Sequence, residues 1–521
     1  MLGDCSLNSS KQIKAGALLS YFAIAFNMIA GLIYTPWMIS KIGQSNYGLY
    51  TLATSLITMF VMDFGMGAAV SRYVSRYRAE GNQTAVNNFL GLIYKLYFLI
   101  DAIILGILVV VSFFINTIYD NLSSGELETF RVLYIIVGLF SVISFPFTNL
   151  NGIMTAYERF VGLKLADLFH KVFIIVAMVA ALLLGYGVYA LVTVNAIAGL
   201  LTIAVKLLII HKKTQVKVNF KYRDKGLLKE IFGFSMWTTI GSIMQRLIFN
   251  ITPSIIAAVS ATGAVGCAVF GLAQTIEGYV YTFATAINGM FMPRISRIIV
   301  RGKKEEELMP LMIKIGRIQL MIVGLISVGF IALGKSFVVD IWNKPDFAES
   351  YWCAVLLIIP SVFYLPMQIG NTTLIVENKV KLQAYVFMAM GAVNVLCSLV
   401  LSRFFGAIGA SLSIFIAYTV RTALMAVIYK KKLGLDMVRF GKETFVKLSP
   451  GLLLTLAVGL LCEYFNPMQN RFLRFGVNGV VLVAFFLMFM WLFGLNDYEK
   501  NLISGIVKKI ISKLHKENYF R

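Results

Sequence analysis

The chain has 521 residues, of which 59% are hydrophobic and only 14% are charged, and its mean hydropathy is +0.80. Soluble domains carry about a quarter charged residues, so this composition excludes a soluble enzyme and makes the lipid bilayer the main solvent of the chain. The formal net charge of +22 would suggest a nucleic-acid partner in a soluble protein. In a membrane protein, the distribution of that charge among the loops instead indicates the orientation of the chain in the bilayer.

A helix needs about 20 apolar residues to cross the hydrocarbon core of a bilayer. The sequence contains fourteen apolar runs of about this length, separated by polar or charged breaks. The predicted spans are 16–39, 47–70, 89–115, 130–152, 168–187, 188–210, 231–260, 267–292, 310–334, 351–370, 383–402, 407–429, 449–465 and 474–494.

The basic residues favour one side of the membrane. Of the 47 lysines and arginines, 34 fall in the N-terminal tail, the C-terminal tail and alternate loops, 7 in the opposite loops and 6 within the spans. This asymmetry predicts an even number of crossings with both termini in the cytoplasm, and it accounts for the net charge without a nucleic-acid partner. The external loops are short, the longest being 116–129, and no Asp-X-Asp pair occurs. We therefore expect no enzyme.

Metal and cofactor chemistry is also not expected. The five cysteines are far apart, and the three histidines lack the spacing of metal ligands. Coupling of transport to protons or sodium ions is compatible with the sequence, because net accumulation by a protein with opposing gates needs an energy source.

The chain divides around its most basic loop into two groups of six spans. Weak similarity between the groups at a nearly constant offset, such as Pro36 with Pro253, suggests an internal repeat. We expect an all-α, polytopic membrane protein with two pseudo-symmetric six-helix lobes and two further C-terminal helices. The predicted divisions are a cytoplasmic tail (1–15), an N-terminal lobe (16–210), a basic cytoplasmic linker (211–230), a C-terminal lobe (231–429), a basic cytoplasmic loop (430–448), helices 13 and 14 (449–494) and a basic amphipathic cytoplasmic tail (495–521).

Ionisable residues within spans are the best candidates for function, because a charge at the bilayer centre costs about 2.5–3.5 kcal/mol and must face protein or water. Arg246 and Glu277 lie at similar depths in consecutive spans, so either they form a structural ion pair or they face a cavity, where they would meet substrate or, at Glu277, couple transport to an ion. Gln274, Glu277 and Tyr281 form a polar stripe at helical spacing, which indicates a cavity wall.

Other polar residues allow two interpretations as well. Asp63 and Lys95 lie at one depth, which favours a structural or gating pair. Asp101 lies near the middle of its span without a local partner, which makes it a candidate proton carrier. Asn27 and Tyr34 share one helical face and contact either ligand or a neighbouring helix.

Two segments carry a family likeness. Residues 42–50 (IGQSNYGLY) and residues 63–67 (DFGMG), the latter followed by 71–73 (SRY), resemble the corresponding segments of bacterial polysaccharide flippases. Looser matches occur at 185–190 (GYGVYA) and 405–410 (FGAIGA).

This resemblance implies membership of the multidrug, oligosaccharidyl-lipid and polysaccharide exporter superfamily. Two lobes would rock between inward-open and outward-open states in the bacterial cytoplasmic membrane. They would move an oligosaccharide on undecaprenyl diphosphate to the outer leaflet, beside polysaccharide polymerase or assembly proteins. Arg246 would then meet the diphosphate in the cavity. Arg72 either is an ordinary positive-inside residue with a structural or gating role or would meet the diphosphate on entry. The alternatives are a peptidoglycan-precursor flippase and a cation-coupled exporter of drugs or small solutes.

Overall fold

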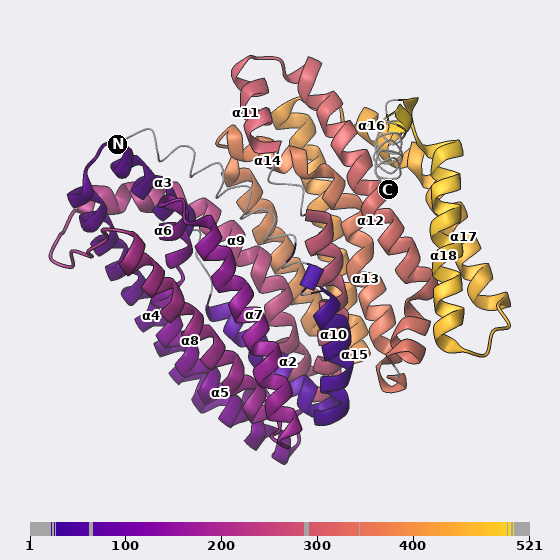
Figure 1. The fold of residues 1–521 in the computed structure, drawn as a ribbon, viewed down its shortest axis with the longest axis horizontal. Helices are drawn as coiled ribbons and strands as arrows, with labels where there is room; N and C mark the ends of the chain where they lie inside the picture. The colour runs from indigo at the N-terminus through magenta and orange to yellow at the C-terminus, as the bar shows by residue number, and fades with distance from the viewer. Residues whose placement is uncertain are drawn as a thin grey trace, which may run out of the picture. The chain divides into compact units, whose positions relative to one another are not determined.

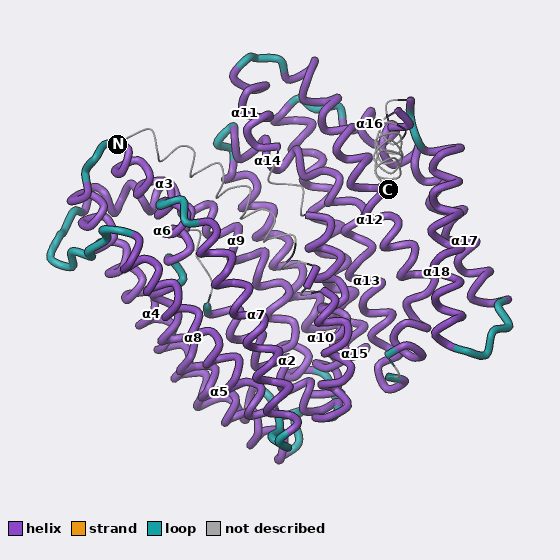
Figure 2. Tube along the Cα trace, viewed as in Figure 1, coloured by secondary structure: helices purple, strands orange, loops and turns teal. Residues whose placement is uncertain are grey.

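The computed structural model describes residues 22, 25–26, 28–61, 66–285, 291–342, 344–497, 499–501 and 504. In this part of the chain all regular structure is helical (Figure 1, Figure 2). Ten of its helices are long and apolar enough to cross a membrane, and one of these, Val380–Leu433, contains two helices that meet at Gly406. Each of the fourteen predicted spans overlaps a helix, which confirms the predicted all-α membrane fold.

The helices form two compact units. Unit 1 comprises Met1–Tyr279 and Lys379–Arg421. After a helix over 28–42, its elements are α2 (Gln44–Phe60), α3 (Met66–Ala79), α4 (Gln83–Ile118), α5 (Ser124–Ser144), the 3-10 turn η1 (Phe145–Phe147), α6 (Leu150–Ala156), α7 (Phe160–Leu183), α8 (Val188–Lys213), α9 (Lys225–Val259), most of α10 (Gly263–Thr285) and the first part of α15 (Val380–Leu433).

Unit 2 comprises Val280–Asn378 and Thr422–Arg521. Its elements include α11 (Met292–Val300), α12 (Met309–Ser336), α13 (Ala348–Tyr364), the 3-10 turn η6 (Leu365–Met367), α14 (Gln368–Val376), the end of α15, α16 (Met437–Phe440), α17 (Lys447–Phe465) and α18 (Arg471–Phe489). Short π-helical segments are η3 (Lys304–Leu308), η4 (Phe337–Ile341), η7 (Gly441–Val446) and η8 (Met490–Gly494). The bounds of these units differ from those of the predicted lobes, which remain a prediction.

Unusual backbone conformations recur along the chain at an almost constant offset. The left-handed φ of Glu158 (55°) is repeated at Asn378 (56°), and the φ of Gly81 (71°) is repeated at Gly302 (71°). The 3-10 turns η1 and η6, each with a central proline, are separated by nearly the same length of chain. Non-glycine residues seldom adopt φ > 0, so this recurrence supports the predicted duplication.

Small residues allow the helices of unit 1 to approach one another closely. A Cβ atom at Gly48 on α2 would collide with the carbonyl group of Ala264 on α10, and one at Gly152 on α6 would collide with the backbone of Gly67 on α3. Lipid chains are as apolar as the side chains, so the hydrophobic effect does not drive helices together in a bilayer. Helices in lipid associate instead through close packing of this kind. The 42–50 motif therefore has a packing role at Gly48.

Several predicted spans differ from the helices in their boundaries, and two of these differences matter most. The predicted span 47–70 contains two helices, since α2 ends at Phe60 and α3 begins at Met66. The predicted span 168–187 begins too late, because α7 starts at Phe160. The eight residues added at the start of α7 carry charge, and they prove important for the candidate site.

One buried arginine attaches the two C-terminal helices to α12. Arg317 is 2% exposed and donates from Nε and Nη2 to the two carboxylate oxygens of Glu499, at 2.6 and 2.7 Å. It also donates to the carbonyl oxygens of Glu443 in η7 (2.6 Å) and Gly494 in η8 (2.5 Å). The guanidinium group therefore pairs with one carboxylate and also satisfies carbonyl groups in two π-helical segments. The first of these, η7, precedes α17, and the second, η8, follows α18.

A second polar cluster joins the other ends of these three helices. Arg474 on α18 lies 3.0 Å from Asp340 after α12 and 3.4 Å from Glu463 on α17. Asn478 donates to Glu463 at 2.8 Å. Between the two polar clusters lies an apolar core that includes Leu320, Leu448, Leu482, Phe486 and Met490. In Figure 1, α17 and α18 run beside α12.

We expect Arg317→Ala to destabilise unit 2 by about 3–5 kcal/mol, because it leaves the carboxylate of Glu499 buried without its partner. Thermal unfolding of the purified protein in detergent would show this as a lower melting temperature. Arg439→Ala is the matched control, since the ion pair of Arg439 with Glu443 is largely exposed, with side chains 52% and 34% accessible. That variant should lose about 1 kcal/mol or less, and equal losses in the two variants would contradict the prediction.

Candidate functional site

A lysine held by two oxygen atoms lies among three helices of unit 1. Lys206 on α8 donates from Nζ to Oδ1 of Asp167 on α7 at 2.8 Å and to Oδ1 of Asn151 on α6 at 2.9 Å. Its side chain is 11% exposed, whereas that of Asp167 is 44% exposed. The ammonium group is therefore sheltered and the carboxylate is open.

The α7–α8 hairpin determines this meeting. Asp167 lies seven residues after the first residue of α7, and Lys206 lies seven residues before the last residue of α8. Because consecutive helices run in opposite directions and rise about 1.5 Å per residue, both side chains lie about 10 Å from the same end of the hairpin.

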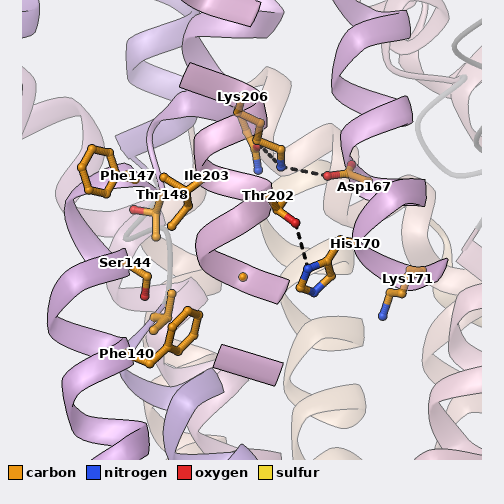
Figure 3. Close-up of a pocket in the computed structure, with 13 residues that line it drawn as sticks. Phe140, Ser144, Phe147, Thr148, Asp167, His170, Lys171, Thr202, Ile203 and Lys206 are labelled. Carbon is orange, nitrogen blue, oxygen red and sulfur yellow. Dashed lines mark hydrogen bonds and ion pairs between the residues drawn. The ribbon is translucent and has the colours of Figure 1, made fainter. Parts of the chain in front are cut away.

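A cavity of about 430 Å³ opens beside this ion pair (Figure 3). The Nδ1 atom of His170 lies 3.0 Å from the hydroxyl oxygen of Thr202, and Lys171 also lines the cavity. Further hydroxyl groups come from Ser144 and Thr148.

The cavity carries an excess of positive charge. Lys171 and Lys206 face a single carboxylate, Asp167, and protonation of His170 would add a further positive charge. A charged amine and several hydroxyl groups around a concave site are suited to binding an anion with polar substituents. The arrangement can therefore bind a phosphate or carboxylate group and donate hydrogen bonds to a neighbouring polar group.

Lys171 is exposed although it lies at the middle of α7, a membrane-spanning candidate. A cation at this depth is stable only when it faces protein groups or water. The face of α7 that carries Lys171 is thus expected to border an aqueous pathway.

Arg246 and Glu277 do not form the ion pair that their depth allowed. Arg246 on α9 is exposed, whereas Glu277 on α10 is 6% exposed. No hydrogen bond or ion pair joins either side chain to another described residue. The ion-pair alternative is therefore set aside, and Arg246 is a second exposed cation at membrane depth in unit 1.

Asp101 and Lys95 both lie on α4 in different surroundings. Asp101 is 9% exposed, and its Oδ1 atom has no hydrogen-bond partner among the described residues. Lys95 donates to the carbonyl oxygen of Tyr222 at 2.8 Å, and its pairing with Asp63 stays a prediction. Asp63 lies outside the described residues, as does Asn27.

Of the remaining predicted residues, Tyr34, Gln274 and Tyr281 are half-buried and Arg72 is exposed. Tyr34 donates to Sδ of Met178 on α7 at 3.2 Å, so it contacts a neighbouring helix. Gln274 and Tyr281 share α10 with Glu277. Arg72 lies on α3, and both Arg72 and Tyr281 are engaged with neighbouring groups. Of the basic amphipathic tail predicted over 495–521, the structure describes only 495–497, 499–501 and 504, and the rest lies outside the described residues.

Comparison with known proteins assigns the chain to a family. Residues 13–299 match the family described as "Polysaccharide biosynthesis protein". The chain belongs to this family. A membrane protein of Methanocaldococcus jannaschii is 23% identical over 422 residues, which cover 78% of this chain and 92% of that protein.

Solved structures show the same fold. The lipid II flippase MurJ in an inward closed conformation matches with a TM-score of 0.71 and 14% identity, covering 94% of this chain and 99% of that chain. An inward-facing multidrug resistance transporter of the MATE family and MOP superfamily has a TM-score of 0.61 and 14% identity, covering 80% and 99%. A MOP superfamily transporter from Pyrococcus furiosus has a TM-score of 0.53 and 14% identity, covering 84% and 96%.

In this polysaccharide biosynthesis protein, sequence reasoning missed the cavity cluster of Asp167, His170, Lys171 and Lys206. The first three were assigned to a loop or to the edge of a span, because α7 was expected to start at 168. The equal distances of Asp167 and Lys206 from one hairpin end were a usable signal. Buried Arg421 on α15, which is 3% exposed and lies 5.2 Å from the ring of Phe387, was also missed.

We expect a cysteine at position 171 of this family member to react with a charged, water-soluble thiol reagent, because the face of α7 that carries Lys171 borders water. The test uses Lys171→Cys in a variant without the native cysteines and measures labelling in intact membranes. Leu165→Cys is the matched control, since Leu165 lies on the same helix and is 49% exposed but does not line the cavity. Equal protection of both positions would place Lys171 in lipid or protein and contradict the prediction.

Proposed function

We propose that this protein is a flippase that moves an undecaprenyl-diphosphate-linked oligosaccharide from the cytoplasmic to the outer leaflet for the synthesis of a surface polysaccharide. The observation that carries the proposal is the positively charged cavity of unit 1 at membrane depth, in a chain of the polysaccharide biosynthesis family. It functions in the bacterial cytoplasmic membrane with both termini in the cytoplasm.

The charge of the cargo explains the charge of the cavity. A diphosphate crosses hydrocarbon only with cationic partners, since an isolated charge there is strongly disfavoured. Lys206 and Lys171 supply such partners in the cavity, and exposed Arg246 supplies another within unit 1. Arg72 meets the diphosphate at the cytoplasmic entrance.

The hydroxyl and amide groups near these cations suit a saccharide. Ser144, Thr148 and Asn151 line the cavity. The hydroxyl groups of Ser144 and Thr148 donate to backbone carbonyl oxygens and offer acceptors to sugar hydroxyl groups, whereas the side-chain NH2 of Asn151 offers a donor. Gln274 and Tyr281 contribute a second polar surface from α10 when the protein alternates between inward-open and outward-open states. Polysaccharide polymerase or assembly proteins then receive the flipped lipid.

Two buried carboxyl groups couple the movement to an ion. Asp101 and Glu277 are 9% and 6% exposed, and no ion pair joins either to another described residue. A buried carboxyl group without a counter-ion favours its neutral form, so proton binding and release during the transport cycle is the simplest coupling. Sodium coupling is the alternative.

A peptidoglycan-precursor flippase is the second candidate, because the fold extends over 94% of the chain in the match to a lipid II flippase. Both cargoes carry a diphosphate, so the charge of the cavity does not distinguish them. Measuring translocation in cells that lack either the lipid-linked oligosaccharide or the peptidoglycan precursor would distinguish them. An exporter of cationic drugs is disfavoured by the positive cavity, and a change in drug resistance without a change in lipid-linked sugars would support it.

We expect Lys206→Met to reduce translocation by roughly 10- to 100-fold, as for the loss of a hydrogen bond to a charged group worth about 1.5–3 kcal/mol. The measurement is the leaflet distribution of undecaprenyl-linked oligosaccharide in deletion cells that carry each variant, normalised to membrane protein. Lys206→Arg keeps the charge and should retain most activity. Lys164→Met, on the same helix as Asp167 but outside the cavity, is the control, and an equal loss there would refute a specific role for the cavity.

We expect Arg246→Ala and Glu277→Gln to impair translocation independently, because the structure does not pair them. Arg246→Ala removes a counter-charge of the diphosphate, whereas Glu277→Gln removes a proton-binding group. Transport rates of the two single variants and the double variant form a double-mutant cycle. Independent roles predict that the fold-losses multiply, and a double variant no worse than Arg246→Ala would reveal direct coupling.

A further inference from the structure

The basic α8–α9 loop, residues 214–224, is docked on α4. The backbone N–H groups of Lys217 and Asn219 donate to Oδ1 and to the carbonyl oxygen of Asn87, at 2.9 and 3.0 Å. The side-chain amide of Asn219 donates to Oδ1 of Asn88 at 2.7 Å. These bonds hold the middle of the loop against the first turns of α4.

Further contacts extend this docking along α4. Gly91 has no side chain, and a Cβ atom there would collide with the carbonyl group of Asn219. The ring of Phe220 lies 6.3 Å from that of Tyr94 and 6.4 Å from that of Phe98. The loop is therefore a defined surface of unit 1.

The cationic side chains of the loop take no part in this docking. Lys217, Lys221 and Arg223 are exposed, and their side chains form no hydrogen bond or ion pair with a described residue. The one acidic residue of the loop, Asp224, is already engaged, because it accepts hydrogen bonds from the backbone N–H of Leu227 and the hydroxyl group of Tyr222. The backbone bond is the main reason that the pKa of Asp224 is lowered. The three cations are thus available to an external anion.

The position of the loop indicates which anion it meets. Phe220 is 51% exposed and contacts Phe98 of α4, which is 50% exposed. Leu99 and Ile103 on the same helix are 62% and 56% exposed. Such apolar side chains on the outside of a membrane-spanning helix face lipid. Aromatic rings next to cations at the end of a span are typical of the headgroup region of a bilayer.

We propose that the docked α8–α9 loop binds the headgroup of an anionic phospholipid of the cytoplasmic leaflet through Lys217, Lys221 and Arg223. Soluble phosphate and an acidic protein fit less well, because neither accounts for the exposed ring and apolar helix face beside the cations. The site is separate from the cavity proposed to bind the flipped lipid. Its test measures lipid binding without transport, so it fails or succeeds independently of the flippase proposal.

The test is a titration of the full-length, delipidated protein in detergent with phosphatidylglycerol and with phosphatidylcholine, followed by native mass spectrometry. We expect the triple variant Lys217→Gln, Lys221→Gln and Arg223→Gln to bind phosphatidylglycerol at least roughly tenfold more weakly, as expected from the removal of three interfacial cations. Binding of phosphatidylcholine should not change.

The matched charge control is the triple variant Lys430→Gln, Lys431→Gln and Lys442→Gln. These lysines are exposed cations of the basic segment 430–448, and their removal changes the net charge by the same amount. Equal weakening in both triple variants would show a general effect of positive charge and overturn the proposal. Displacement of phosphatidylglycerol by soluble diphosphate would also overturn it, since the site would then recognise the phosphate group alone and not the lipid.

A second pair of variants tests the docked conformation without a change of charge. Gly91→Ala places a Cβ atom against the carbonyl group of Asn219 and should displace the loop, whereas Gly106→Ala, on the same helix, has no neighbour within 4 Å of the added Cβ atom. We expect weaker phosphatidylglycerol binding only in Gly91→Ala, with both variants folded by thermal unfolding. Unchanged binding in Gly91→Ala would show that the docked loop is not the site.

Discussion

A charged side chain within a bilayer must find a protein partner or water, because the hydrocarbon itself offers neither. The described part of this chain satisfies the constraint in both ways. Arg317 donates to two carboxylate oxygens and two carbonyl oxygens and is almost completely buried. Lys171 and Arg246 are exposed at membrane depth. Structural cations are thus recognisable by their partners, and candidate transport cations by their exposure.

Lys206 combines the two situations. Asp167 and Asn151 hold its ammonium group, yet the ion pair borders a cavity, and the carboxylate is nearly half exposed. A substrate anion that enters this cavity would compete with Asp167 for the lysine. Lys206 would then have an anionic partner both with and without bound substrate. This suits a transporter, because a bound anion that can be replaced by Asp167 can also be released.

Much of the fold could be predicted because hydropathy and helix length are properties of consecutive residues. Each of the fourteen predicted spans overlaps a helix, and Gly48 in the family motif lies at a close helix contact. The candidate site was harder to predict. An error of eight residues at the start of α7 concealed Asp167, and the matched depths of Arg246 and Glu277 said nothing about the direction in which each side chain points.

The sequence alone indicated the membrane environment, the all-α fold and the family, because each depends on composition or on residues close together in the chain, and it suggested the internal repeat. Only the tertiary structure decided which charges meet. Lys95 bonds to the carbonyl oxygen of Tyr222, Lys206 bonds to Asp167, and Glu277 lies apart from Arg246. These outcomes depend on the rotation of each helix about its axis and on its neighbours. Packing between helices distant in sequence sets both.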